Sequence, residues 1–88
     1  MDYYLTNHAN DALVKRKIPL VWLERTLFAP EWTEKDRIDN ELEHRLARIP
    51  EFGGRVLRII VNPTVKPLRI ISVYFDRRRK NDEVESGS

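Results

Sequence analysis

Two apolar runs of nearly equal length, separated by a turn, dominate the second half of this 88-residue chain. Residues 55–61 and 68–75 are rich in valine, isoleucine and leucine, which favour β-strands. Between them lie Asn62, Pro63 and Pro67, which are typical of turns. The two runs therefore predict an antiparallel hairpin, and the rest of the chain must cover at least one face of it.

Two amphipathic helices precede the hairpin. Either Thr6 or Asn7 can cap the first helix, which is predicted to run to about Lys17. Ile18 and Pro19 end it, and proline suits the first position of a second helix because its missing N–H would be unpaired there. The second helix has a broad apolar face and closes at Pro30; this face comprises Leu20, Trp22, Leu23, Leu27 and Phe28.

The middle of the chain is more ambiguous. Residues 31–41 are acidic and polar without a clear period, which predicts a loop with at most a short turn of helix. Residues 42–49 fit either a helix or a strand. The turn-forming cluster 50–54 and the strand-like run that follows favour a hairpin joining 42–49 to 55–62. Residues 3–5 are short and aromatic, and predict an opening strand.

The predicted order is β-α-α-β-β-β. This order indicates an α+β domain with two N-terminal helices packed on one face of an antiparallel four-stranded sheet. The length argues for a single domain over residues 1–80. Residues 81–88 are predicted to be a disordered tail, in which Gly87 and Ser88 have the character of residues left by cloning.

Several protein classes are excluded by what the sequence lacks. There is no cysteine, and the two histidines, His8 and His44, are far apart in the chain, so no metal site is predicted. No apolar run approaches the roughly 18 residues of a membrane span, and no signal segment opens the chain. We expect a cytoplasmic domain without a cofactor or a membrane partner.

The charge is unevenly distributed. The net charge is only +2, but residues 55–80 carry eight basic side chains and one acidic side chain. Arginine outnumbers lysine by eleven to five, and the planar guanidinium suits phosphate better than an ammonium group does. The basic block is therefore consistent with an anionic partner such as RNA, and equally with a solvated surface of scattered arginines.

Strand alternation predicts which side chains remain on the uncovered face of the sheet. The apolar sets belong under the helices: Leu57, Ile59 and Val61 in one strand and Ile71, Val73 and Phe75 in the other. Arg58, Ser72 and Tyr74 are then left on the open face. If Leu42 and Leu46 also point inward, Glu43 and Arg45 join the open face.

Such a face could cleave RNA without a metal, which requires a base, an acid and cations around the phosphate. The predicted catalytic residues are His8 or Tyr74 for proton transfer and Arg58 for the phosphate. The predicted RNA-binding residues are all arginines: Arg45, Arg58, Arg69, Arg77 and Arg78. Structural roles remain open for the same side chains, since Tyr74 could simply pack, Arg58 could pair with Glu43, and His44 could be a semi-buried structural histidine.

Five short motifs resemble those of domain-of-unknown-function family 4258 over about residues 3–79. They are Asn7-His8-Ala9, the stretches 15–19 and 26–30, and the two hairpin runs 55–61 and 69–78. Members of that family look akin to RelE/ParE-type toxins. The resemblance implies a sheet cupped by two helices, RNA cleavage, and a cognate antitoxin as partner. It places the family's early histidine on His8, its hairpin basic residue on Arg58 and its last-strand aromatic residue on Tyr74.

A second hypothesis is a non-enzymatic interaction module. A four-stranded open sheet has two edges, and unpaired edges invite pairing with another chain or with a second copy. In a homodimer, the basic run 77–80 could contact the acidic segment 31–43 of the other copy.

Overall fold

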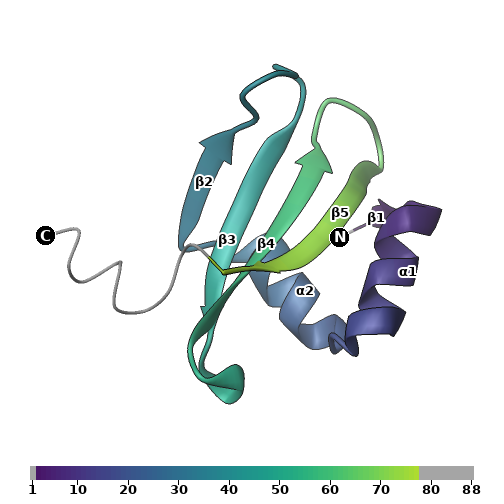
Figure 1. Cartoon of the computed structure of the whole chain (residues 1–88). Helices are drawn as coiled ribbons and strands as arrows, with labels where there is room; N and C mark the ends of the chain where they lie inside the picture. The colour runs from purple at the N-terminus through teal and green to yellow at the C-terminus, as the bar shows by residue number, and fades with distance from the viewer. Residues whose placement is uncertain (1, 78–88) are drawn as a thin grey trace, which may run out of the picture.

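A computed structural model describes residues 2–77 as two helices on one side of a five-stranded sheet (Figure 1). The strand order across the sheet is β1-β5-β4-β3-β2. β1 runs parallel to β5, and every other neighbouring pair is antiparallel. The elements in chain order are β1 (Tyr3–Leu5), α1 (Asn7–Arg16), α2 (Leu20–Phe28), β2 (Trp32–Lys35), β3 (Glu43–Ile49), a short 3-10 turn η1 (Pro50–Phe52), β4 (Arg55–Asn62) and β5 (Leu68–Asp76).

The helix ends follow from local chemistry. Thr6 caps α1 because its hydroxyl accepts a hydrogen bond from the Ala9 N–H at 3.2 Å. Lys17 ends α1 in the left-handed conformation, with φ of 55°. Pro19 is the N-cap of α2 rather than its first helical residue, so α2 begins at Leu20, one position later than the sequence predicts.

One continuous core lies between the helices and the sheet. The face of the sheet beneath the helices, here called the helix side, holds the apolar alternation of β4 as predicted: Leu57, Ile59 and Val61 are fully buried. Ala9 and Leu13 from α1 and Leu23 and Leu27 from α2 pack against this face. Their burial leaves the opposite face, here called the open face, to carry the remaining side chains. Figure 1 views the open face, with α2 passing behind the strands.

Two features of the predicted sheet are wrong. Residues 32–35 were expected in a loop, but they form β2, a fifth strand at the edge of the sheet. The sheet is also mixed rather than antiparallel, because β1 crosses over to run parallel to β5. The ambiguous segment 42–49 is resolved as a strand, since β3 pairs with β4 along its whole length from residue 43. The predicted two-helix hairpin and both strand hairpins are confirmed.

A β-bulge changes the predicted alternation in β5. Ile60 pairs with Ser72, whereas the next residue, Val61, pairs with Ile70, so Ile71 is an extra residue in β5. As a result Ile70, and not Ile71, joins the buried core. Beyond the bulge, Ser72 and Tyr74 face the open side, as the alternation predicts. Within residues 2–77, neither helix is long and apolar enough to cross a membrane.

Candidate nucleic-acid interface on the open sheet face

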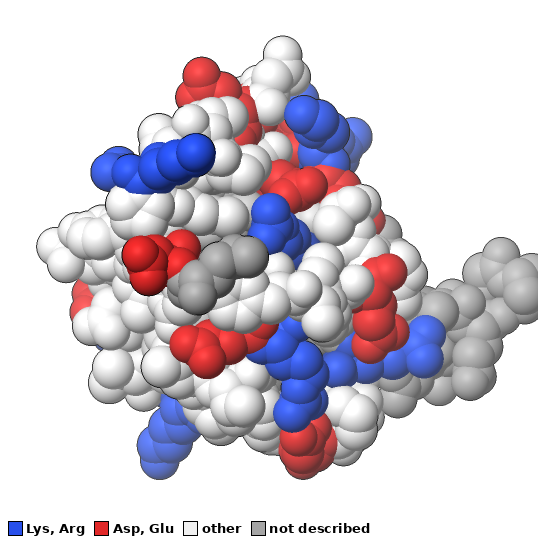
Figure 2. Space-filling model, turned by 180° about the vertical axis from the view of Figure 1, so that it is seen from behind, with Lys and Arg blue, Asp and Glu red and all other residues white. Residues whose placement is uncertain are grey.

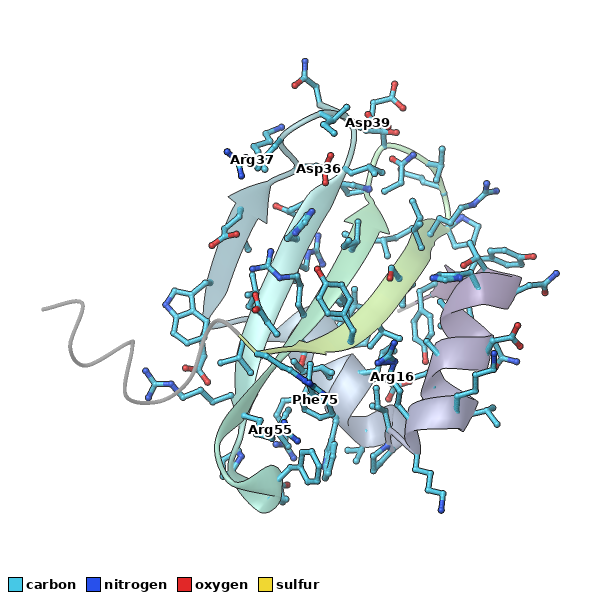
Figure 3. All side chains as sticks on the ribbon, viewed as in Figure 1. Arg16, Asp36, Arg37, Asp39, Arg55 and Phe75 are labelled. Carbon is cyan, nitrogen blue, oxygen red and sulfur yellow. The ribbon has the colours of Figure 1, made fainter. Side chains whose placement is uncertain are left out.

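Strand register places four side chains in one row across the open face. Trp32 on β2 pairs with Leu46 on β3, Leu46 pairs with Arg58 on β4, and Arg58 pairs with Tyr74 on β5. Directly paired residues project to the same side of a sheet, so these four form a continuous row, here called the central row. The predicted neighbourhood of Arg58 and Tyr74 is therefore confirmed. Figure 3 shows the side chains crowding this viewer-facing side of the sheet.

Arg58 is the centre of a hydrogen-bond network that reaches three strands. Its Nε and Nη2 donate to Asp76 Oδ2 on β5 at 3.0 and 2.5 Å. Its Nη1 donates to Glu34 Oε1 on β2 at 3.2 Å and to His44 Nδ1 on β3 at 2.6 Å. The Arg58 side chain is only 10% exposed and that of Asp76 only 4%. Burial alone would lower the pKa of Arg58, but Asp76 and Glu34 outweigh it and raise this pKa above its usual value.

The network fixes the tautomer of His44. An arginine can only donate, so His44 Nδ1 must accept the hydrogen bond from Arg58 and carry no proton. The proton then lies on Nε2, which donates to Asp36 Oδ1 at 2.7 Å. Asp36 also accepts from the backbone N–H groups of Asp39 and Ile38. These bonds lower the pKa of Asp36 to about 2, with the Asp39 N–H first in effect and the His44 ring next.

Two further aromatic–arginine pairs lie on the same face. The Arg48 guanidinium lies over the Trp32 ring at 5.3 Å, and the Arg69 guanidinium lies over the Tyr4 ring at 5.5 Å. Register assigns both pairs to the open face. Arg48 is two residues from Leu46 in β3. Arg69 and Tyr4 pair with each other, and the next pair, Ile70 and Leu5, faces the core. Arg69 is exposed, as its predicted role in RNA binding requires.

Two predicted site residues lie on the opposite side of the sheet. His8 is exposed in the first turn of α1, which packs on the helix side through Ala9 and Leu13, so it does not meet Arg58 or Tyr74. The expectation that Arg45 and Glu43 join the open face is wrong. Arg45 Nε donates to Glu43 at 2.9 Å, and Nη1 donates to the Leu27 carbonyl at the end of α2, also at 2.9 Å.

The error in β3 comes from Leu46. Taking Leu46 as an inward residue reverses the alternation of the whole strand. In the structure Leu46 lies on the open face, where it is fully buried between its row neighbours Trp32 and Arg58. Ala47 and Ile49 point toward the helices. Of the other predicted arginines, Arg77 is exposed in the turn after β5, and Arg78 lies outside the described residues, as do the tail 81–88 and most of the basic run 77–80.

Three acidic members of the network are not among the predicted site residues. Glu34, Asp36 and Asp76 were not singled out as site residues, although they hold Arg58 and His44 in place. Only Glu34 has a usable signal in the sequence. If residues 32–35 form a strand, Glu34 lies on the same face as the apolar Trp32, because the two are two positions apart. His44, whose role the sequence leaves open, is semi-buried with both ring nitrogens bonded and lies beside Arg58 at the centre of the site.

The helix side has a different surface. Figure 2 shows basic and acidic side chains interspersed over it, separated by uncharged residues, without a broad area of one sign. A cluster of rings lies at the end where α2 meets η1: Phe52 and Phe75 are 4.9 Å apart, and Trp22 is 5.7 Å from Phe52. The Arg55 guanidinium lies over the Phe52 and Phe75 rings. Figure 3 labels Arg55 and Phe75 at the lower end of the sheet.

Among residues 2–77, no three histidine, aspartate or glutamate side chains form a group that could hold a metal ion. The groups that the open face presents are a buried arginine, a histidine of fixed tautomer, carboxylates and three aromatic rings.

Comparison with known proteins gives one match. Neither the curated proteins nor the solved structures contain a chain that matches this one. The model of one protein family, described as a domain of unknown function (DUF4258), matches residues 5–75. This range runs from the last residue of β1 to the penultimate residue of β5, so it includes the central row, His44 and Glu34 but leaves out Tyr4 and Asp76. The chain therefore belongs to the DUF4258 family.

Proposed function

We propose that the open face binds RNA and cleaves it by transesterification, using side chains only. The observation that carries this proposal is the position of Arg58. Tyr74 pairs with Arg58 from the neighbouring strand β5. In the direction of β2, the Arg58 Nη1 donates a hydrogen bond to Glu34 at 3.2 Å. A cation between a carboxylate and a phenol is the minimal set that this reaction requires.

The division of labour follows from the chemistry of each group. The Glu34 carboxylate takes the proton of the ribose 2′-hydroxyl, and the 2′-oxygen attacks phosphorus. The Tyr74 hydroxyl donates its proton to the 5′-oxygen as the P–O5′ bond breaks. Arg58 stabilises the negative charge that develops on the phosphoryl oxygens. The products are a 2′,3′-cyclic phosphate and a free 5′-hydroxyl, so the reaction consumes no water and needs no co-reactant.

His44 and Asp36 serve as positioning residues in this proposal. Both ring nitrogens of His44 are engaged, one by Arg58 at 2.6 Å and the other by Asp36 at 2.7 Å. The imidazole therefore holds the Arg58 guanidinium in position. His44, and not His8, is the histidine of this site, because His8 lies on the other side of the sheet. Kinship with RelE/ParE-type toxins would imply the same reaction, and two N-terminal helices on one sheet face agree with that kinship.

Cleavage of a single-stranded RNA in EDTA, followed by analysis of the product ends, tests the proposal. The wild-type chain should release 5′-hydroxyl ends, and Tyr74→Phe and Glu34→Gln should each slow the reaction by about 10²–10⁴-fold, the usual contribution of a general acid or base. Tyr3→Phe is a matched control, because it removes a phenolic hydroxyl that donates to Glu24 at 2.7 Å on the helix side. It should leave the rate unchanged.

Two results would reject the proposal. One is the absence of cleavage by a folded wild-type chain. The other is a rate that Tyr3→Phe and Tyr74→Phe reduce equally, since that would trace the loss to stability rather than to the open face.

The alternative, association through a sheet edge, has less support from the architecture. The two edge strands, β1 and β2, are only three and four residues long. Short edge strands are one of the ways in which native sheets avoid edge-to-edge pairing. Sedimentation analysis at two protein concentrations tests this alternative, which requires a concentration-dependent dimer.

A further inference from the structure

We infer that the open face is a stacking platform for single-stranded RNA, with base-binding positions at Trp32, Tyr74 and Tyr4. The inference deepens the proposed function, on which it rests, by naming the substrate class. Three of the chain's eight aromatic residues lie on this face, one on each of β2, β5 and β1, and each has an arginine as its neighbour. Alternating rings and guanidinium groups are what successive bases and phosphates of one strand require.

The dimensions of the face fit a short stretch of nucleotides. Trp32 and Tyr74 end the central row and are three strand steps apart, which is roughly 14 Å at about 4.8 Å per step. Tyr4 extends the surface by one more strand, opposite Arg69 near the start of β5. At about 3.4 Å per stacked base, the central row alone spans roughly four nucleotides. A strand crossing it would pass directly over Arg58.

The outer arginines retain more hydrogen-bonding capacity than Arg58, which makes four hydrogen bonds with its five N–H donors. Arg58 is engaged by Asp76, Glu34 and His44, whereas within residues 2–77 neither Arg48 nor Arg69 donates a side-chain hydrogen bond. Arg48 Nε is buried and forms an ion pair with Glu31 Oε1 at 3.8 Å, a distance longer than a hydrogen bond. The terminal nitrogens of Arg48 and the guanidinium of Arg69 can therefore bind phosphate while the adjacent ring binds a base.

The same arrangement disfavours a duplex. In double-stranded RNA the base faces are stacked inside the helix and are not available to rings on a protein surface. A duplex would have to bind through its phosphates alone and would leave the three rings of this face without bases to stack on. Single-stranded RNA gains both the stacking and the phosphate contacts at the two ends of the platform.

Fluorescence anisotropy with a labelled octanucleotide tests the inference. The probe is a 2′-fluoro RNA, which has no 2′-hydroxyl and so reports binding without cleavage; the comparison is the same sequence as a blunt duplex. We expect at least tenfold tighter binding of the single strand. Trp32→Leu and Tyr4→Leu should each weaken that binding by about 5- to 150-fold, the range for loss of one base–aromatic stack.

Phe28→Leu is the matched control. Phe28 is a ring of similar exposure, at 44% against 51% for Tyr4, but it lies on α2 and packs against Tyr3 at 6.3 Å on the helix side. Its replacement should leave binding unchanged. Leucine keeps an apolar cover over Leu46 in the Trp32 variant, and circular dichroism would verify that each variant remains folded.

The outcomes separate this inference from the cleavage proposal. Equal affinity for the duplex, no measurable binding, or binding that Trp32→Leu and Tyr4→Leu leave unchanged would each overturn the platform, even if cleavage were observed. Selective binding that both variants weaken, without cleavage by the wild-type chain, would support the platform and reject the reaction. A dimer that Trp32→Leu dissociates, in a chain that binds no RNA, would assign the face to a second copy and overturn the inference.

Discussion

Replacing Asp76 by asparagine tests the physical basis of the site, because it removes one charge from the buried Arg58 pair while retaining the shape of the side chain. The two side chains are 10% and 4% exposed and share two hydrogen bonds. For unit charges about 4 Å apart at an effective dielectric constant of 20, the attraction is about 4 kcal/mol. Breaking a buried ion pair typically destabilises a protein by about 3–5 kcal/mol. Since Glu34 still accepts from Arg58 at 3.2 Å, we expect a loss near the lower limit, about 3 kcal/mol.

The effect should be large compared with the stability of the domain. A chain of this length has a free energy of unfolding of roughly 4–13 kcal/mol, and a loss of about 3 kcal/mol lowers Tm by roughly 12–24 °C. Urea denaturation followed by tryptophan fluorescence measures the change directly. Glu51→Gln is the control: Glu51 accepts two hydrogen bonds from Arg25, at 2.8 and 2.6 Å, but both side chains are largely solvated. Its effect should be much smaller, because water screens an exposed pair.

A double-mutant cycle completes the test. Arg58→Met alone should also be strongly destabilising, since it leaves Asp76 buried without its cation, whereas Arg58→Met with Asp76→Asn should be milder than the two single losses together. The reasoning is refuted if Asp76→Asn costs no more than Glu51→Gln, or if the two single changes simply add. Either result would mean that the open face is wetter than the structure indicates, and that Arg58 is not held as the proposed reaction requires.

Three further predictions follow from the same contacts. Arg45→Met should lower stability by about 1–2 kcal/mol in urea denaturation, because it removes a charged donor to the α2 carboxyl end, and it should leave RNA binding unchanged. Leu57→Ala should cost about 2–5 kcal/mol in the same assay, because Leu57 is fully buried between sheet and helices. The pKa of Asp36 is depressed from 3.8 to about 2, so its contribution to stability is complete above about pH 4 and is lost as the pH falls toward 2; Asp36→Asn should remove that part of the acid dependence, and an unaltered pH profile would contradict the assignment.

Much of the fold is predictable because its strongest signals are local. The apolar alternation of residues 55–61 predicts the inward face of β4 correctly, since a hydrophobic period of two is sufficient to orient a strand. β2 was missed for the opposite reason. It has four residues with only one large apolar side chain, Trp32, and its pairing with β3 depends on contacts across the chain rather than on its own sequence.

The site is harder to predict than the fold, since it depends on register. Arg58 and Tyr74 were placed together correctly because both lie in strongly apolar strands. His8 was favoured over His44 by its place in a motif, yet only His44 shares a face with Arg58. Arg45 was misplaced because a single inward assignment, that of Leu46, reverses every neighbour in β3.

The extra residue at Ile71 decides which side chains of β5 share a face of the sheet. Arg69 and Tyr74 are five positions apart, an odd spacing that in an uninterrupted strand would send them to opposite sides. Because the bulge takes one residue out of the alternation, Arg69 and Tyr74 reach the same surface while Ile70 and Val73 remain in the core. Deletion of Ile71 would remove the bulge and shorten this spacing to four positions, so a regular strand would still place Arg69 and Tyr74 on one surface and Ile70 and Val73 in the core. Relatives without the extra residue would therefore keep the same residues on this surface, whereas a strand of the present length without the bulge would separate Arg69 from Tyr74.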